Sequence, residues 1–293
     1  MFVSDKLIYI MLQKTGSNYI AKLLSQTVGG KQINSCKIGK HGWLKNYDTE
    51  KHIVGSVRNP WDWYVSYWHF RRRVIDKNNN KFLIQRNWKK ISSLLFNSMF
   101  NNDYSPFNRK NISLNDVWLH IKSEIRKPVG LYRDVLCGKP DKKKFKKFLY
   151  LIFDDERMRD FGEGYAESSI GSFSGFMTYR YFKIYEKDFF KEKFFKGIKN
   201  YNQLKKFDEE NNILDFTIKT ENLKRDLIEI LNKTNHELSP EDINTIMCSK
   251  KTNTSSHLKT SYYYDEEAVE LIRNKEKFII EKYNYKSPLD CFH

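Results

Sequence analysis

The stretch KLIYIMLQKTGSN, residues 6–18, decides how the N-terminal part of the chain folds. Residues 6–11 form a nearly unbroken apolar run, which is typical of a strand buried on both faces of a sheet. After a polar turn, apolar residues recur at helical spacing up to the glycine pair at 29–30, namely Ile20, Leu23, Leu24 and Val28. The sequence therefore predicts a strand, a tight turn and a helix in succession.

A second unit of the same kind lies at residues 52–74. His52–Val57 is predicted to be another buried strand, and after it Asn59 suits an N-cap and Pro60 the first helical position. The helix would run to about Val74 with one apolar face, made of Trp61, Tyr64, Val65 and Trp68. Two successive strand–turn–helix units predict a parallel α/β sheet.

The pattern becomes regular again near the C-terminus. Residues 213–218 are a third buried-strand candidate, and further helices are predicted after Leu223, from the cap at Ser239, and over residues 265–283. Residues 76–205 hold aromatic-rich helical stretches without clear boundaries. We therefore expect one α/β domain over residues 1–293, with its core at about 1–75 and 206–293 and a long helical insertion at about 76–205.

The composition bounds the class of protein. The 293 residues include 21 Phe, 18 Tyr and 6 Trp but only 13 Gly and 6 Pro, so the chain can bury a core, and global disorder or a collagen-like repeat is excluded. Its 52 Lys and Arg against 36 Asp and Glu give a net charge of +16. This charge favours an anionic partner without choosing among nucleic acid, membrane, sulfated sugar and nucleotide.

The cellular setting is predicted from what the sequence lacks. It shows no apolar run near the roughly 18 residues of a membrane span and no signal-peptide pattern. The cysteines have neither a CxxC pair nor metal-ligand spacing; they are Cys36, Cys137, Cys248 and Cys291. We expect a soluble cytoplasmic protein without a membrane span, or a catalytic domain cut from a longer chain.

The turn after the first strand suits a phosphate group. Unpaired N–H groups and the helix dipole favour an anion there, Lys14 adds a full charge, and Gly16 allows close approach of the backbone. Thr15 and Ser17 add hydroxyls. The order of residues is not GxxxxGK[ST], which disfavours an ATPase that holds Mg²⁺ on its Ser/Thr. The alternative is an ordinary strand–helix turn with a solvated Lys14.

Arg58 and Ser66 could hold a second phosphate. Arg58 follows the second strand at the edge where open α/β sheets bind ligands. Ser66 lies off the apolar stripe of the next helix, so that face need not bury it. An arginine fork and a hydroxyl from two elements would clamp a phosphate. The alternative is that Arg58 pairs with Asp62 and that Ser66 is solvated.

Together these motifs resemble the sulfotransferase superfamily, which uses 3′-phosphoadenosine 5′-phosphosulfate (PAPS). QKTGSN at 13–18 resembles its 5′-phosphosulfate loop, PKTGT or PKxGS, with Gln13 in place of the usual Pro. VRNPWD at 57–62 with Ser66 and Tyr67 resembles RNPxDRxxSxY, the 3′-phosphate motif of carbohydrate sulfotransferases, with Trp63 where Arg is common. The resemblance covers about 1–75 and 213–285, which includes further fitting segments at 221–223, 253–257 and 262–265.

The resemblance implies a P-loop-like α/β fold and sulfuryl transfer from PAPS to an acceptor hydroxyl, with PAP as the product and no metal. A carbohydrate acceptor is favoured, and the insertion would recognise it. Lys14 and the N–H groups of four residues would neutralise the bridging oxygen, namely Thr15, Gly16, Ser17 and Asn18. Arg58 and Ser66 would hold the 3′-phosphate. The loop 253–257, with Ser255 and Ser256, could close over the nucleotide.

The acceptor hydroxyl needs a general base, and the sequence offers seven histidines. His41 lies between the two motifs, where the resemblance places a base. The alternatives are His69 or His257, an acid, or a His41 that is merely a surface residue. His52 opens a strand and is expected to pack. Lys40 could support the sulfuryl group or be solvated.

Two other functions stay open. One is a P-loop nucleotide kinase or phosphotransferase, against which the incomplete Walker motif counts. The other is a non-enzymatic polyanion- or nucleic-acid-binding protein driven by net charge; a specific nucleic-acid partner is not expected. The basic run 139–147 could attract an acidic acceptor or form a solvated helix face. Tyr262 to Tyr264 are expected to pack rather than stack on bases. The oligomeric state is not predicted.

Overall fold

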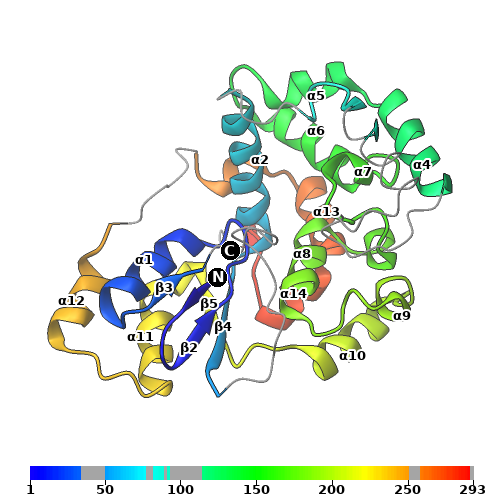
Figure 1. Cartoon of the computed structure of the whole chain (residues 1–293). Helices are drawn as coiled ribbons and strands as arrows, with labels where there is room; N and C mark the ends of the chain where they lie inside the picture. Colours follow the sequence, from blue (N-terminus) through cyan, green and yellow to red (C-terminus); the bar gives the residue numbers. More distant parts are fainter. Residues whose placement is uncertain (34–49, 77–81, 89–90, 93–113, 251–257, 291–293) are drawn as a thin grey trace.

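The computed structural model describes residues 1–33, 50–76, 82–88, 91–92, 114–250 and 258–290. Within them the chain is an α/β protein with a mixed five-stranded sheet in the order β3-β1-β2-β4-β5 (Figure 1). The strands are β1 (Phe2–Val3), β2 (Leu7–Tyr9), β3 (Lys31–Gln32), β4 (His52–Val57) and β5 (Phe216–Lys219).

The described helices group into three stretches of the chain. The first holds α1 (Ser17–Thr27) and α2 (Pro60–Asp76). The second holds α4 (Leu114–Ile125), α5 (Val129–Leu136), α6 (Lys142–Phe153), α7 (Met158–Phe161), η1 (Ser169–Ser172), α8 (Phe176–Tyr185), α9 (Glu192–Phe195) and α10 (Tyr201–Asn211). The third holds η2 (Thr220–Asn222), α11 (Leu223–Lys233), α12 (Pro240–Cys248), η3 (Thr260–Tyr263), α13 (Glu266–Lys275) and α14 (Lys277–Tyr283).

The centre of the sheet is parallel, as expected. β2 pairs with β4 from Leu7 opposite His52, and β4 pairs with β5 up to Val57 opposite Lys219. The carboxyl ends of the three strands therefore lie at one edge of the sheet, followed by the turn at 13–16, by Arg58 and by Thr220. Parallel pairing thus places the two predicted motifs next to each other.

The expectation of a wholly parallel sheet is wrong at its edge. β1 runs antiparallel to β2, with Phe2 opposite Tyr9, and β3 runs antiparallel to β1. A tight turn makes this hairpin, in which Ser4 N donates to Leu7 O at 3.0 Å. Strands of two residues are too short to show an alternating pattern, so the sequence could not announce them.

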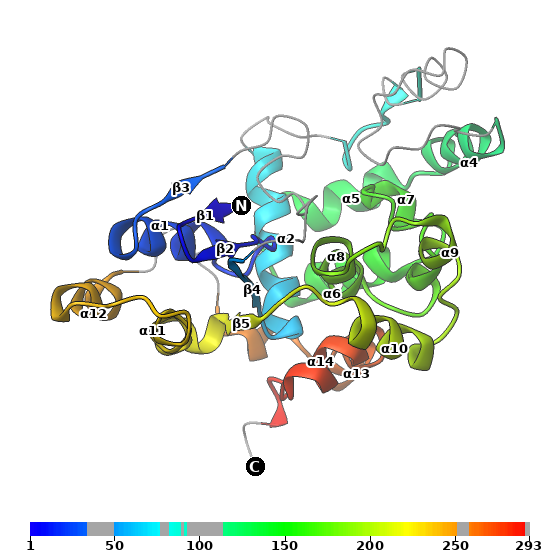
Figure 2. The same ribbon diagram turned by 60° about the horizontal axis from the view of Figure 1, so that its bottom comes forward.

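The sheet separates two hydrophobic cores. Leu7, Tyr9 and Met11 face one core, with side chains of α1, α11 and α12. Ile8 and Ile10 face the other, with α2 and the helices of the insertion. Figures 1 and 2 show α1, α11 and α12 on one side of the sheet and the insertion on the other. Burial on both faces explains the unbroken apolar run at 6–11.

The predicted helix over residues 265–283 is two helices, which meet at Glu276. This side chain is fully buried and accepts hydrogen bonds from the N–H groups of Met177 at 3.1 Å and Thr178 at 2.9 Å, at the start of α8. It also accepts from the hydroxyls of Tyr64 and Thr178. Glu276 therefore ties α2, α8 and the C-terminal helices together, and it interrupts the helix to do so.

Burial raises the pKa of Glu276 to about 7, although the four donors favour the charged form. Below about pH 4.5 the carboxyl is protonated in the folded and the unfolded chain alike. Between there and about pH 7 only the unfolded chain releases the proton, so this group lowers stability as pH rises.

We predict that Glu276→Gln removes this dependence. As pH rises across that window, the variant should gain unfolding free energy relative to wild type, by at most ~1.4 kcal/mol per pH unit. Urea unfolding at pH 5, 6, 7 and 8 measures this difference. A difference that stays constant over this range would contradict the assignment.

Candidate functional site

The turn between β2 and α1 is anchored by Thr15. The Thr15 hydroxyl donates to Leu12 O at 2.8 Å and lies 2.6 Å from the hydroxyl of Ser56 on β4. The Ser56 hydroxyl lies 2.7 Å from that of Tyr9. All three hydroxyl-bearing residues are fully buried. Thr15 therefore uses its hydroxyl inside the protein, which leaves its backbone N–H for the predicted ligand contact.

α1 begins in a conformation that favours glycine. Gly16 is the N-cap with a φ of 75°, and a Cβ there would lie 3.2 Å from the Cδ1 atom of Leu223. No side chain caps this helix, and Gly16 O accepts from Tyr19 N at 2.9 Å. The N–H groups of Ser17 and Asn18 in the first turn have no partner within the helix and are available to an anion.

The two predicted motifs meet in space. Nη1 of Arg58 donates to Lys14 O at 3.3 Å. The Thr220 hydroxyl lies 3.1 Å from Thr15 O and 2.8 Å from Val57 O, so it joins the turn to the end of β4. The segments that follow β2, β4 and β5 thus form one site at the carboxyl edge of the sheet.

Lys14 lies among positive charges. Its Nζ is 4.8 Å from the centre of the Phe70 ring on α2. The pKa of Lys14 is lowered to about 8, first by burial and then by the charges of Arg58, Arg73 and Arg180. Because the charged groups that cause this shift are all arginines, the described surroundings of Lys14 favour an anion.

Arg58 does not pair with Asp62, which was the alternative. Among the described residues no ion pair involves Arg58. Asp62 instead accepts a hydrogen bond from the Thr260 hydroxyl, and Glu221 accepts from Asn59 N at 2.7 Å. Burial lowers the pKa of Arg58, while Asp62 and Glu221 raise it. The Arg58 guanidinium is therefore held in place and keeps donors for a ligand.

Ser66 is only 3% exposed, although its position on the helix suggested that it need not be buried. Almost all of α2 from Pro60 to Trp68 is buried, because this helix lies between the sheet and the insertion. The apolar stripe of Trp61, Tyr64, Val65 and Trp68 is accordingly only part of its buried surface. The role of Ser66 in binding a phosphate stays a prediction.

Several predicted residues lie outside the described part of the chain. They are Lys40, His41, Asn253, Ser255, Ser256 and His257. Of the alternative bases, His69 is described: its Nε2 lies 3.1 Å from the Tyr263 hydroxyl. His69 neighbours Trp68 and Tyr263, whereas Lys14 lies over Phe70. His52 packs at 5.7 Å against the ring of Phe216, in line with the packing role expected of it.

Sequence reasoning missed Arg180 of α8. This side chain is 5% exposed and donates to the side chains of Gln13 and Glu163. It thereby links the turn at 13–16 to the insertion, and Gln13, which departs from the family pattern, is its partner. The one available signal was a lone arginine inside an aromatic-rich helix, which suggests a buried and paired charge.

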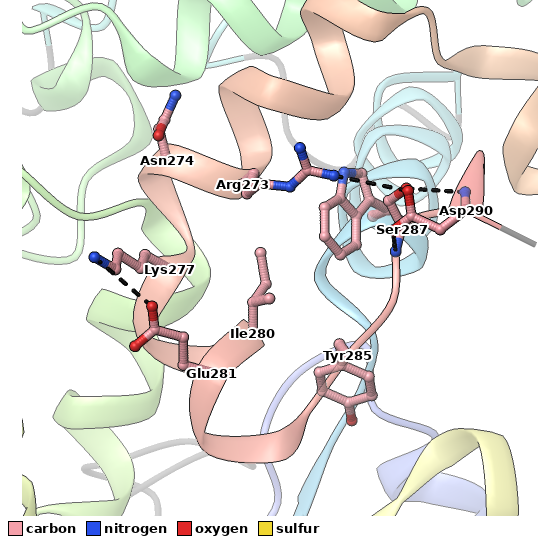
Figure 3. Close-up of a pocket in the computed structure, with 9 residues that line it drawn as sticks. Arg273, Asn274, Lys277, Ile280, Glu281, Tyr285, Ser287 and Asp290 are labelled. Carbon is pink, nitrogen blue, oxygen red and sulfur yellow. Dashed lines mark hydrogen bonds and ion pairs between the residues drawn. The ribbon is translucent and has the colours of Figure 1, made fainter.

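A hollow of about 310 Å³ lies beside α13, α14 and the segment after them (Figure 3). Lys277 lies 3.7 Å from Glu281, and Arg273 lies 3.8 Å from Asp290. These charged groups neutralise one another, so the hollow offers no net charge for an anion.

Comparison with protein-family models, with curated proteins and with solved structures found no match. Among the described helices, none is both long and apolar enough to cross a membrane. In the same part of the chain, no group of three or more His, Cys, Asp or Glu side chains could hold a metal ion. The functional argument therefore rests on the geometry of the site.

We predict that Thr220→Val weakens the connection between the turn at 13–16 and the end of β4. Valine keeps the shape of threonine but leaves the carbonyls of Thr15 and Val57 without this donor, which should cost about 1–2 kcal/mol of unfolding free energy. Denaturant unfolding measures the loss, and Thr220→Ser, which keeps the hydroxyl, serves as the control. Equal stability of Thr220→Val and wild type would contradict this role.

Proposed function

We propose that this protein is a PAPS-dependent sulfotransferase that moves a sulfuryl group to an acceptor hydroxyl, with a carbohydrate as the favoured acceptor. The observation that carries the proposal is the contact of Arg58 with the carbonyl of Lys14. It joins two motifs 44 residues apart into one cationic site. A nucleotide with phosphates on both its 3′ and 5′ carbons is the ligand that such a site would suit.

The P-loop-like assignment of the fold belongs to the same proposal. Its support is the sequence of β2, a tight turn with Gly16, and α1, beside the parallel strand β4. In open α/β sheets, ligands bind outside the carboxyl ends of the strands, where the turn and Arg58 lie. The antiparallel strands β1 and β3 lie on the other side of β2 from the parallel strands β4 and β5.

Each group would have a distinct role toward the donor. The N–H groups of Ser17 and Asn18, with Lys14, would bind the 5′-phosphosulfate. The Arg58 guanidinium, with its planar fork of donors, would bind the 3′-phosphate, and the predicted contribution of Ser66 would add a hydroxyl. These groups would neutralise the negative charge that is dispersed in the loose transition state of sulfuryl transfer.

The proposed reaction is a direct transfer. The acceptor oxygen attacks the sulfur atom in line, the bond from sulfur to the bridging oxygen breaks, and its electron pair stays on the 5′-phosphate of PAP. Protonated Lys14 would stabilise that developing charge. The hydroxyl proton would pass to a general base, for which His41 remains the proposed residue and His69 or His257 the alternative.

Calorimetry tests the proposal against its two alternatives. PAP should bind more tightly than AMP or ATP, because only PAP carries the 3′-phosphate. Arg58→Ala should lower the affinity for PAP by a factor of at least about 10 and thereby remove this preference. Arg225→Ala on α11 removes an exposed arginine beside Asp226 and should change nothing.

Equal binding of the three nucleotides by wild type would contradict the proposal, and tighter binding of ATP than of PAP would favour a kinase. Strongly salt-dependent binding of oligonucleotides without preference for any nucleotide would favour a polyanion-binding protein.

The pKa of Lys14 makes a separate prediction. Lys14 loses its charge as pH rises through about 8, so the affinity for PAP should fall above that pH, by up to about tenfold per pH unit. Lys14→Arg keeps the charge throughout and should bind PAP equally at pH 7 and pH 9. The same decline in both proteins would show that another group is responsible.

A further inference from the structure

Arg71 of α2 is a half-buried cation for which the described residues provide no hydrogen-bond acceptor and no ion-pair partner. Its Nη2 is shielded from solvent and forms no hydrogen bond. Among the described residues, no carboxylate forms an ion pair with it either. A buried N–H group left unsatisfied costs about 1–3 kcal/mol, so this arrangement needs a physical reason.

Two aromatic rings hold the side chain of Arg71 in place. The guanidinium carbon lies 4.4 Å from the centre of the Phe82 ring and 5.6 Å from that of Tyr67. Cation–π attraction offsets part of the lost hydration and fixes the plane of the guanidinium. The rings provide no acceptor, however, so the Nη2 donor of Arg71 remains unused in a fixed orientation.

Two further cations approach the same turn of α2. Arg180 is only 5% exposed, and its guanidinium carbon lies 5.1 Å from the centre of the Tyr67 ring. The Nε atom of Arg180 is buried without a hydrogen-bond partner in the described part of the chain. Lys14 lies over Phe70. Tyr67, Phe70 and Arg71 are three and four residues apart, so they share one face of the helix.

The nearby carboxylate is already engaged. Glu163 accepts from Arg180 and lies 3.2 Å from Lys183, and these two cations draw its pKa down to about 2 against the effect of burial. It therefore stays ionised but is shared between two positive groups. Together with Lys14 and Arg71, this leaves an excess of positive charge on the insertion side of the site.

We infer that Arg71 and Arg180 form a second anion site, which binds a carboxylate or sulfate group on the acceptor. The inference rests on the proposed function, and it assigns the acceptor to the class of acidic oligosaccharides. The 3′-phosphate of the donor does not explain this site. Arg71 lies eleven residues after Pro60, about 16 Å along α2, whereas Arg58 precedes that helix.

The test is calorimetry with a hexasaccharide of alternating hexuronic acid and N-acetylhexosamine, in the presence and absence of PAP. Its carboxyl-reduced form and an O-sulfated carboxyl-reduced form distinguish carboxylate from sulfate recognition. Wild type should bind at least one acidic form at least tenfold more tightly than the neutral form. Arg71→Gln should abolish this difference, and Arg71→Lys, which keeps the charge but not the fork, should retain part of it.

The control is Arg126→Gln, which removes an exposed arginine of the insertion and should leave the difference unchanged. Affinity of Arg71→Gln for PAP should match wild type, which shows that the variant folds and that the donor site is intact. A tenfold difference that survives in Arg71→Gln, or its absence in wild type, would overturn the inference. Failure of wild type to bind PAP would instead contradict the proposed function. The two outcomes can be told apart because binding of the hexasaccharide without PAP measures the second site alone.

Discussion

Parallel pairing of β2 with β4 is the constraint on which the rest of the site depends. The register of Leu7 with His52 and Tyr9 with Val54 makes both strands end at the same edge of the sheet. The turn that follows β2 and the Arg58 that follows β4 must then be neighbours. A shift in this pairing would separate Arg58 from the carbonyl of Lys14 and turn the apolar side chains of β2 to the wrong cores.

Buried hydroxyl groups fix this edge in detail. Ser56, near the carboxyl end of β4, connects to the Thr15 hydroxyl in the turn and to the Tyr9 hydroxyl on β2. Its backbone N–H also donates to the hydroxyl of Tyr185 at 2.9 Å, at the end of α8. A serine that appeared to be an ordinary strand residue therefore links the sheet, the turn and the insertion. Such networks stabilise one arrangement because every buried group finds its partner there.

The sequence predicted the elements whose signals are local. The strand His52–Val57, the start of α2 at Pro60, and the capped start of α12 at Ser239 are confirmed, because apolar runs, proline and capping residues act within a few positions. The hairpin of β1 and the interruption at Glu276 were not predicted. Both follow from contacts with distant segments, which no local pattern records.

The same distinction applies to the site. Lys14, Gly16 and Arg58 could be placed at the edge of the sheet because they adjoin strand ends. Arg180 was not, because its link to Gln13 joins residues 167 positions apart. Ser66 was placed on the right helix, but its burial depends on the insertion that packs over α2, and that packing is not visible in the helical period.

The central claim is that the turn after β2 and Arg58 bind one nucleotide through two phosphates. A crystal structure of the protein with PAP tests it most directly. The account predicts the 5′-phosphate at the N–H groups of Ser17 and Asn18 near the Lys14 ammonium, and the 3′-phosphate at the Arg58 guanidinium. PAP bound elsewhere, or bound at this edge with its 3′-phosphate away from Arg58, would contradict it.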